Sequence, residues 1–222
     1  VGSPFDFANQ GVLYMPKHLP EPGRDGPSQD VLTELGELID AAGGRTLALF
    51  SSWRGVEAAD LHLRNVLAEL PIKIITQKRG DAVGPLVERF AKDETSVLIG
   101  TMSLWQGVDV PGNSCVLVAI DRIPFPRPDE PVMSARASQA DAAGGSGFMQ
   151  VSLPRAALLL AQGTGRLIRS VDDRGVVAIL DSRIVTKRYG SVLLNSMPPL
   201  WRTSEKGVVI DSLRRLRESM KQ

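Results

Sequence analysis

The sequence has a single cysteine, no long apolar run and almost no net charge, and each absence removes a class of protein. Cys115 alone cannot form an internal disulfide or provide a cysteine-ligated metal or iron–sulfur site within this chain. It lies in the apolar run 114–120, which favours a buried hydrophobic position. No apolar stretch reaches the length of a membrane-spanning helix, and the N-terminus lacks the basic-then-apolar pattern of a signal peptide. We therefore expect a cytoplasmic protein without a metal site of its own.

The charges nearly cancel, because 26 basic and 25 acidic residues leave a formal net charge of +1. Binding to a nucleic acid would therefore depend on a local patch rather than on bulk charge. At 222 residues the chain is long enough for one sizeable α/β domain and short for two.

The loop that binds nucleoside triphosphates in many motor proteins is also missing. Its pattern, G-x-x-x-x-G-K-[ST], cradles the phosphates and seats the metal, yet this sequence contains no Gly-Lys pair. Phosphoryl-transfer chemistry would therefore require a second domain.

The sequence does contain the octet Q-G-T-G-R-L-I-R at 162–169. If the octet is helical, Gln162, Arg166 and Arg169 share one face, because residues three and four apart are neighbours on a helix. Two neighbouring guanidiniums favour an anion between them. A polyphosphate suits them, because a guanidinium stabilises the charge that develops on a transferring phosphoryl group. A solvated basic helix face is the alternative interpretation.

Apolar runs alternate with helical patterns along the chain. A short apolar run lies at 11–15, and strands are predicted at 46–50, 72–75, 96–100, 115–120 and 175–180. Helices are predicted from the cap at Ser28 to the stop at Gly43, and at 56–70, 83–90, 133–143, 153–161 and 208–220. This alternation predicts a single α/β domain over 1–222, with a mostly parallel central sheet between two helical layers.

Ligands of such sheets bind beyond the carboxyl ends of the strands. Three segments of unusual chemistry follow predicted strands: 51–54, 101–109 and the loop after Ile120. We expect the functional site along this edge, with Arg166 and Arg169 directed toward it.

Three segments together resemble motifs of superfamily 2 DNA helicases, in the branch that includes DinG and XPD. The octet resembles motif VI, which reads Q-x-x-G-R-x-I-R in this branch. L-A-L-F-S-S-W-R-G-V at 47–56 resembles motif IV, and G-T-M-S-L-W-Q-G-V-D-V-P-G at 100–112 resembles motif V. S-P-F-D-F at 3–7 and I-P-F-P-R-P-D-E-P at 123–131 are also similar. The resemblance covers nearly the whole chain and implies the second RecA-like motor domain, with motifs IV, V and VI.

Proteins of this family carry the phosphate loop in a preceding domain. The resemblance therefore implies that this chain is a C-terminal fragment, inactive alone, from which the N-terminal ATP-binding domain is absent. That first domain of the same polypeptide would hold most of the ATP and Mg2+, and any iron–sulfur cluster would lie outside this chain. The implied protein is a monomeric, ATP-dependent 5'-3' DNA helicase that acts in DNA repair or replication.

The resemblance implies six residues around the nucleotide: Gln162, Gly165, Arg166, Arg169, Gly107 and Asp109. The two arginines would reach across the interdomain cleft to the γ-phosphate, and Gln162 would form hydrogen bonds beside it. Gly165 would let the backbone approach closely, since it has no Cβ. Gly107 would supply a turn, and Asp109 would contact the ribose or a motif VI arginine. A solvated position for Gln162 and a simple turn position for Asp109 are the alternatives.

The same resemblance places single-stranded DNA along seven residues: Ser51, Ser52, Trp53, Arg54, Gln77, Thr101 and Trp105. Hydroxyls and amides suit phosphates, because they donate hydrogen bonds without selecting a base. Arg54 would add charge, and the two tryptophans would stack on bases, which is worth ~1–3 kcal/mol each. A packing role is the alternative for both tryptophans.

Two other hypotheses compete with a motor domain. One is a non-catalytic single-strand nucleic-acid-binding or protein-interaction module derived from a helicase domain, although a net charge near zero disfavours tight independent binding to DNA. The other is a nucleotide-binding regulatory domain outside the helicases. An upstream G-x-x-x-x-G-K-[ST] loop would distinguish a motor from that regulatory domain.

Overall fold

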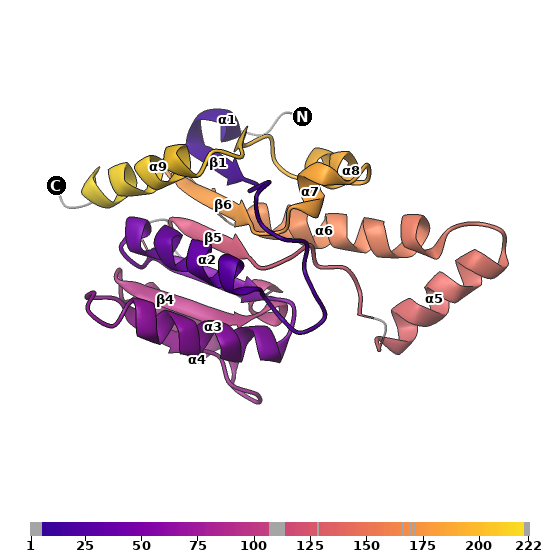
Figure 1. Ribbon diagram of the computed structural model, residues 1–222, viewed down its shortest axis with the longest axis horizontal. Coiled ribbons are helices and arrows are strands. Elements are labelled where there is room, and N and C mark those ends of the chain that lie inside the picture. The colour runs from indigo at the N-terminus through magenta and orange to yellow at the C-terminus, as the bar shows by residue number, and fades with distance from the viewer. Residues whose placement is uncertain are drawn as a thin grey trace.

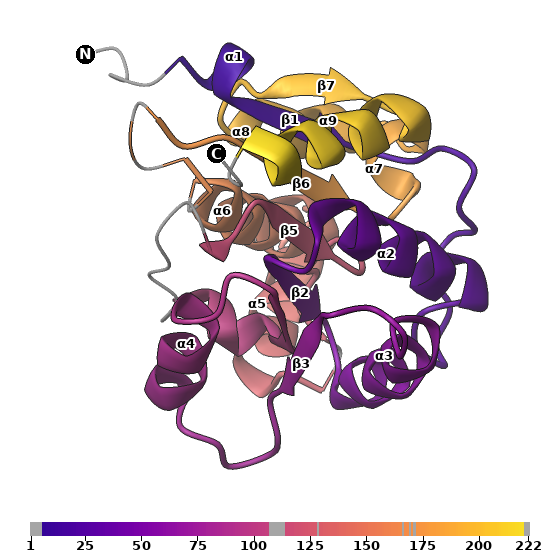
Figure 2. The ribbon, with the colours of Figure 1, turned by 90° about the vertical axis from the view of Figure 1, so that its left-hand side faces the viewer.

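One parallel sheet forms the centre of the protein. The computed structural model describes residues 6–106, 114–127, 129–165, 167–168, 170 and 172–219, without the side chains of Trp105 and Gln106. The sheet has seven strands in the order β3-β4-β2-β5-β6-β1-β7, and every neighbouring pair is parallel. Figure 2 shows this order from β7 at the top to β3 at the bottom. The strands are β1 (Gly11–Tyr14), β2 (Thr46–Phe50), β3 (Lys73–Thr76), β4 (Ser96–Thr101), β5 (Leu117–Ile120), β6 (Gly175–Ile179) and β7 (Trp201–Thr203).

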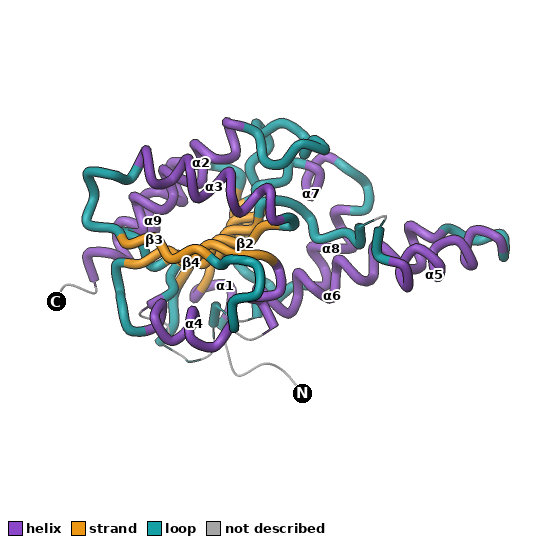
Figure 3. The backbone as a smooth tube through the Cα atoms, turned by 90° about the horizontal axis from the view of Figure 1, so that it is seen from below, coloured by secondary structure: helices purple, strands orange, loops and turns teal. Residues whose placement is uncertain are grey.

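Helices cover both faces of the sheet, as Figure 3 shows. One face packs against α2 (Gln29–Ala42), α3 (Trp53–Val66) and α9 (Lys206–Ser219). The other packs against α4 (Val83–Ala91), α6 (Leu153–Thr164), α7 (Arg183–Thr186) and α8 (Gly190–Ser196). The remaining helices are α1 (Phe7–Gln10), the 3-10 helix η1 (Met102–Gln106), α5 (Pro131–Ala142) and the π-helix η3 (Phe148–Ser152). The predicted three-layer α/β/α fold is confirmed.

Local signals set most helix boundaries. The Ser28 hydroxyl accepts a hydrogen bond from Val31 N at the start of α2, and Gly43 ends that helix in the left-handed region at φ 68°. The start predicted for the next helix is wrong: α3 begins at Trp53, three residues before Val56, because the Ser52 hydroxyl caps it by accepting from the backbone N–H of Gly55. None of the described helices is long and apolar enough to cross a membrane.

A helical arm projects from one end of the sheet. In Figure 1, α5 lies farthest from the body, on the side toward which the strand arrows point. No residue of α5 is buried. The segment 144–147 forms a turn after α5: Gly144 has φ 81°, and Gly147 N donates to the Asp141 carboxylate over 2.7 Å.

The turn between α2 and β2 requires glycine at position 44. Gly44 has φ 86°, and a Cβ there would lie 2.2 Å from the backbone oxygen of Thr95. Gly80 provides a matched control, because it has φ 88° but a Cβ would meet nothing within 4 Å. We predict that Gly80→Ala costs about 1 kcal/mol of unfolding free energy for the strained φ alone. Gly44→Ala should cost about 1–3 kcal/mol more, because backbone must move. Urea unfolding of both variants measures this difference, and equal losses would contradict it.

Candidate functional sites at the two edges of the sheet

Polar side chains line the carboxyl edge of the sheet. Since all strands are parallel, their carboxyl ends meet at one edge. The residues that end or follow five of the strands there are Gln77, Thr101, Ser51, Asp121 and Asp181. This edge brings together the hydroxyl and amide residues that the sequence predicted for motifs IV and V.

Gln77 positions two hydroxyls rather than facing solvent. Its side chain is buried, and its Oε1 accepts from Thr101 N at 2.8 Å and from Thr101 Oγ1 at 3.2 Å. Its Nε2 donates to Ser103 Oγ at 3.3 Å, and the Thr101 and Ser103 hydroxyls lie 2.7 Å apart. Ser103 is exposed and was missed by the sequence analysis, although its spacing of two residues from Thr101 in the same loop could have suggested it.

Asp121 organises the end of β2. Its carboxylate accepts from Ser51 N at 3.0 Å and Ser51 Oγ at 3.2 Å, and it pairs with Arg122 Nε at 3.1 Å. Burial raises the pKa of Asp121 to about 6, against the opposing effects of the Arg122 guanidinium and the Ser51 hydrogen bonds. The sequence analysis selected the loop after Ile120 but neither of these two charged residues.

The start of α3 combines a cap with an aromatic ring. The Ser52 hydroxyl accepts from Gly55 N, while Trp53 is half-buried with the Arg79 guanidinium 5.4 Å from its ring centre. Arg54 is exposed, and its Nη1 lies 3.4 Å from Oδ1 of the fully exposed Asp25. An ion pair this exposed contributes little to stability. Of Trp105, only the backbone in η1 is described.

The described residues of the octet lie at the opposite, amino edge. Helix α6 precedes β6 and runs back across the sheet, so it ends where β6 begins. Gln10, directly before β1, donates through Nε2 to the backbone oxygens of Ser170 at 2.8 Å and Asp173 at 3.2 Å. Arg166 and Arg169 themselves lie outside the described residues, so the expectation that they are directed toward the carboxyl edge stays a prediction, although Gln162 and Gly165 lie at the amino edge.

The expected helical face is also interrupted. Helix α6 ends at Thr164 with Gly165 as its C-cap, and the buried Leu167 and Ile168 are not helical. Gln162 is exposed in the last turn of α6. Four residues predicted at the nucleotide lie outside the described part of the chain: Arg166, Arg169, Gly107 and Asp109.

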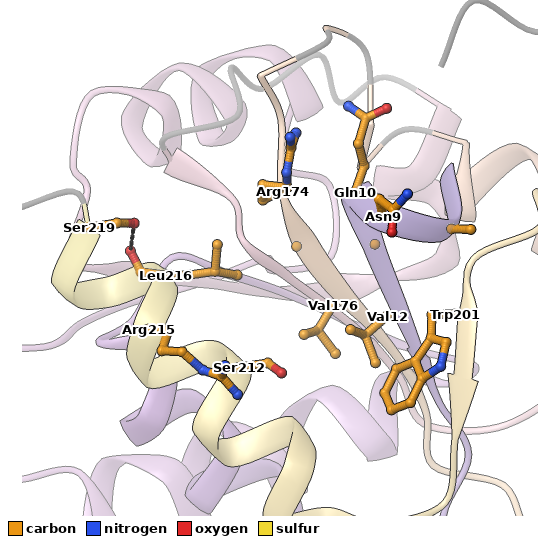
Figure 4. Close-up of a pocket in the computed structure, with 13 residues that line it drawn as sticks. Asn9, Gln10, Val12, Arg174, Val176, Trp201, Ser212, Arg215, Leu216 and Ser219 are labelled. Atoms are coloured by element: carbon orange, nitrogen blue, oxygen red, sulfur yellow. Dashed lines mark hydrogen bonds between the residues drawn. The ribbon is translucent and has the colours of Figure 1, made fainter. Parts of the chain in front are cut away.

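The amino edge also contains a cavity of about 490 Å³. Val12 and Val176 form its floor, as Figure 4 shows, and α9 forms one side. The charged residues among its described lining are Arg174 and Arg215, so the hollow is cationic with an apolar floor. A cavity of this size is typical of small-molecule sites.

The described residues contain no group of three or more His, Cys, Asp or Glu side chains able to hold a metal ion. Carboxylates are the usual protein ligands of Mg2+, together with substrate phosphates.

The all-parallel sheet between two helical layers, with motif-like segments at both edges, defines a RecA-like α/β domain. Its fold is similar to that of an XPD helicase structure, with a TM-score of 0.60 and 17% identity over 87% of this chain and 36% of that one. It is also similar to the C-terminal domain of the DEAD-box protein Dbp5, with a TM-score of 0.54 and 15% identity over 95% and 98% of the two chains.

The chain belongs to the helicase C-terminal domain family, which matches residues 35–200. It is 56% identical over 217 residues to the ATP-dependent helicase DinG of Mycobacterium tuberculosis H37Rv, covering 97% of this chain and 32% of that protein. It is 36% identical over 203 residues to the ATP-dependent DNA helicase YoaA of Escherichia coli K12, covering 91% and 31%. The chain thus spans about a third of the length of these curated relatives.

The buried Asp121 gives a test of the carboxyl edge by pH. Because the folded state raises its pKa to about 6, the folded protein holds this proton more tightly than the unfolded chain does. The contribution of Asp121 to the unfolding free energy therefore falls as pH rises from about 4 to about 6 and is constant above that range. A difference of about two pKa units between the folded and unfolded states corresponds to roughly 3 kcal/mol of unfolding free energy.

We predict that Asp121→Asn removes this fall. Between pH 4 and pH 7, the unfolding free energy of the variant should therefore rise by on the order of 2–3 kcal/mol relative to that of the original protein. Denaturant unfolding at both pH values measures the change. Asp25→Asn is the control, because the side chain of Asp25 is 99% exposed. Parallel pH profiles for Asp121→Asn and the unsubstituted protein would show that this carboxyl titrates normally.

Proposed function

We propose that this chain is the second motor domain of an ATP-dependent, DinG/XPD-like DNA helicase, and that it acts with an ATP-binding first domain of the same polypeptide. The observation that carries the proposal is the separation of two chemistries by the sheet. The hydroxyls of motifs IV and V lie at the carboxyl edge, and the flanks of the arginine octet lie at the amino edge. The end of β4 lies at the carboxyl edge, and the start of β5 lies at the amino edge. The segment between these two strands, which contains most of motif V, therefore connects the two edges.

At the amino edge, the first domain presents ATP and Mg2+. Arg166 and Arg169 contact the γ-phosphate and stabilise the charge that develops as it is transferred. Gln162 forms hydrogen bonds beside the phosphates, and Gly165 permits close approach of the backbone. Gly107 and Asp109 place motif V against the ribose or a motif VI arginine.

At the carboxyl edge, single-stranded DNA crosses motifs IV and V. The hydroxyls of Ser51, Ser52, Thr101 and Ser103 face the backbone phosphates, and Gln77 acts as a positioning residue behind them. Such contacts hold the strand without selecting a sequence.

Next to these hydroxyls, Trp53 and Trp105 stack on bases, while Arg54 and Arg79 add positive charge. ATP-driven closure of the two domains then moves the strand, with 5'-3' polarity as the family resemblance implies.

Removal of the arginine finger tests the nucleotide half of the proposal. In the polypeptide that includes the first domain, Arg166→Ala should lower DNA-stimulated ATP turnover by ~10³-fold or more, because the transition-state charge loses its stabilising guanidinium. Nucleotide affinity should remain nearly unchanged. Arg214→Ala, on the exposed face of α9, removes the same charge as a control. Turnover that stays normal in Arg166→Ala would remove the finger assignment.

A hydroxyl deletion tests the DNA half. Thr101→Val keeps the shape of the side chain but removes the hydroxyl at the end of β4, together with its hydrogen bond to Gln77. We predict a loss of roughly 3- to 10-fold in affinity for a single-stranded oligonucleotide. Thr33→Val, on the exposed surface of α2, is the matched control. Fluorescence anisotropy measures both. Equal affinity of Thr101→Val and the unsubstituted protein would place the strand elsewhere.

A further inference from the structure

A small pocket continues the carboxyl edge beyond Ser51, toward the base of the helical arm. Its volume is about 120 Å³. The lining includes Ser51, Met102, the loop 124–127 and two residues of α6, Arg155 and Leu159. A bulk water occupies about 30 Å³, so the pocket has room for about four waters. A phosphate group fits in that space.

Among the charged residues of this lining, Arg155 is the half-buried one, and it has no ionic partner among the described residues. It forms no hydrogen bond or ion pair with them. Arg127, in the same pocket, is already paired with Asp129 at 2.6 Å. Glu130 also lines the pocket, but its carboxylate accepts from Arg127 N. The planar donors of a guanidinium match the oxygens of a phosphate, so an anion of this kind suits Arg155.

The opposite wall of the pocket is rigid. The Phe125 ring lies 5.3 Å from the Phe148 ring and 5.6 Å from the Tyr189 ring, and the Arg183 guanidinium lies 5.7 Å from its centre. Arg183 is itself fixed by the buried Asp181, through a 2.7 Å contact from Nη2 to Oδ2. A pocket wall supported in this way needs little further ordering when a ligand arrives.

We propose that Arg155 binds one backbone phosphate of the single strand that crosses Ser51, with Phe125 as the apolar wall beside the adjoining sugar. This subsite rests on the proposed function, because it extends the same DNA path toward the helical arm. Arg155 would add a cation from α6 to the proposed DNA contacts at the carboxyl edge, which are mainly hydroxyls. Motifs IV, V and VI do not include this residue.

The salt dependence of DNA binding tests the subsite. The polypeptide with both motor domains is titrated with a fluorescent oligo-dT between 50 and 300 mM salt, chosen as roughly the range over which counterion release is measurable. Arg155→Ala should weaken binding roughly tenfold at the lowest salt. The slope of log affinity against log salt should decrease by about 0.7, the value expected for one phosphate contact on a single strand. Arg155→Lys should retain most of that slope, because the slope counts charges.

Arg214→Ala is again the matched control and should change neither affinity nor slope. If the unsubstituted protein binds the oligonucleotide and Arg155→Ala leaves affinity and slope unchanged, the subsite is wrong and the proposed function stands. A loss of affinity at constant slope would also overturn the subsite, because it indicates a structural effect without a phosphate contact. Failure of the unsubstituted protein to bind single-stranded DNA overturns both proposals.

Discussion

The common direction of the strands is the constraint on which the rest of the structure depends. Because every strand of the sheet points the same way, each return segment must cross from the carboxyl edge back to the amino edge. The two edges therefore collect different parts of the sequence: residues that follow strands at one, and residues that precede strands at the other. Thr101 is the last residue of β4 and Ser170 precedes β6, so the two lie at opposite edges. A domain of this kind can hold two ligands that never touch.

Two buried carboxylates give the carboxyl edge its order. Asp121 and Asp181 each follow a central strand, each accepts a backbone N–H from another loop, and each has an arginine partner one or two residues further along the chain. A buried carboxylate is stable only when its lone pairs are satisfied, so these contacts fix the adjoining loops in one arrangement. Hydroxyls held against such loops need little further ordering when a phosphate approaches them.

The fold was largely predictable, and the location of the octet was not. The apolar run 46–50 predicted a buried strand, and it forms β2. Ser28 predicted the start of α2 by the hydrogen bond of its hydroxyl, and Gly43 predicted its end because glycine readily adopts a positive φ. The strand β7 escaped prediction, because three residues paired only with β1 carry no periodic pattern. The carboxyl-edge rule applies to segments that follow strands, whereas Gln162 and Gly165 precede β6 and lie at the amino edge. Which edge a segment reaches follows from topology, which depends on pairings between distant residues that spacing along the chain does not encode.

Helix α6 is the element that joins the two proposed sites. It carries Arg155 in its first turn at the carboxyl edge and Gln162 in its last turn at the amino edge. Its 12 residues span about 18 Å, at 1.5 Å per residue, and its inner face packs against the sheet through Ala156 and Leu160. A helix packed in this way moves as a rigid body, because close-packed interiors do not deform continuously. In the proposed function, a strand phosphate at Arg155 and a nucleotide beside Gln162 would therefore bind at the two ends of one packed helix. If binding at one end changes the affinity at the other, reciprocity requires the two changes in affinity to be equal.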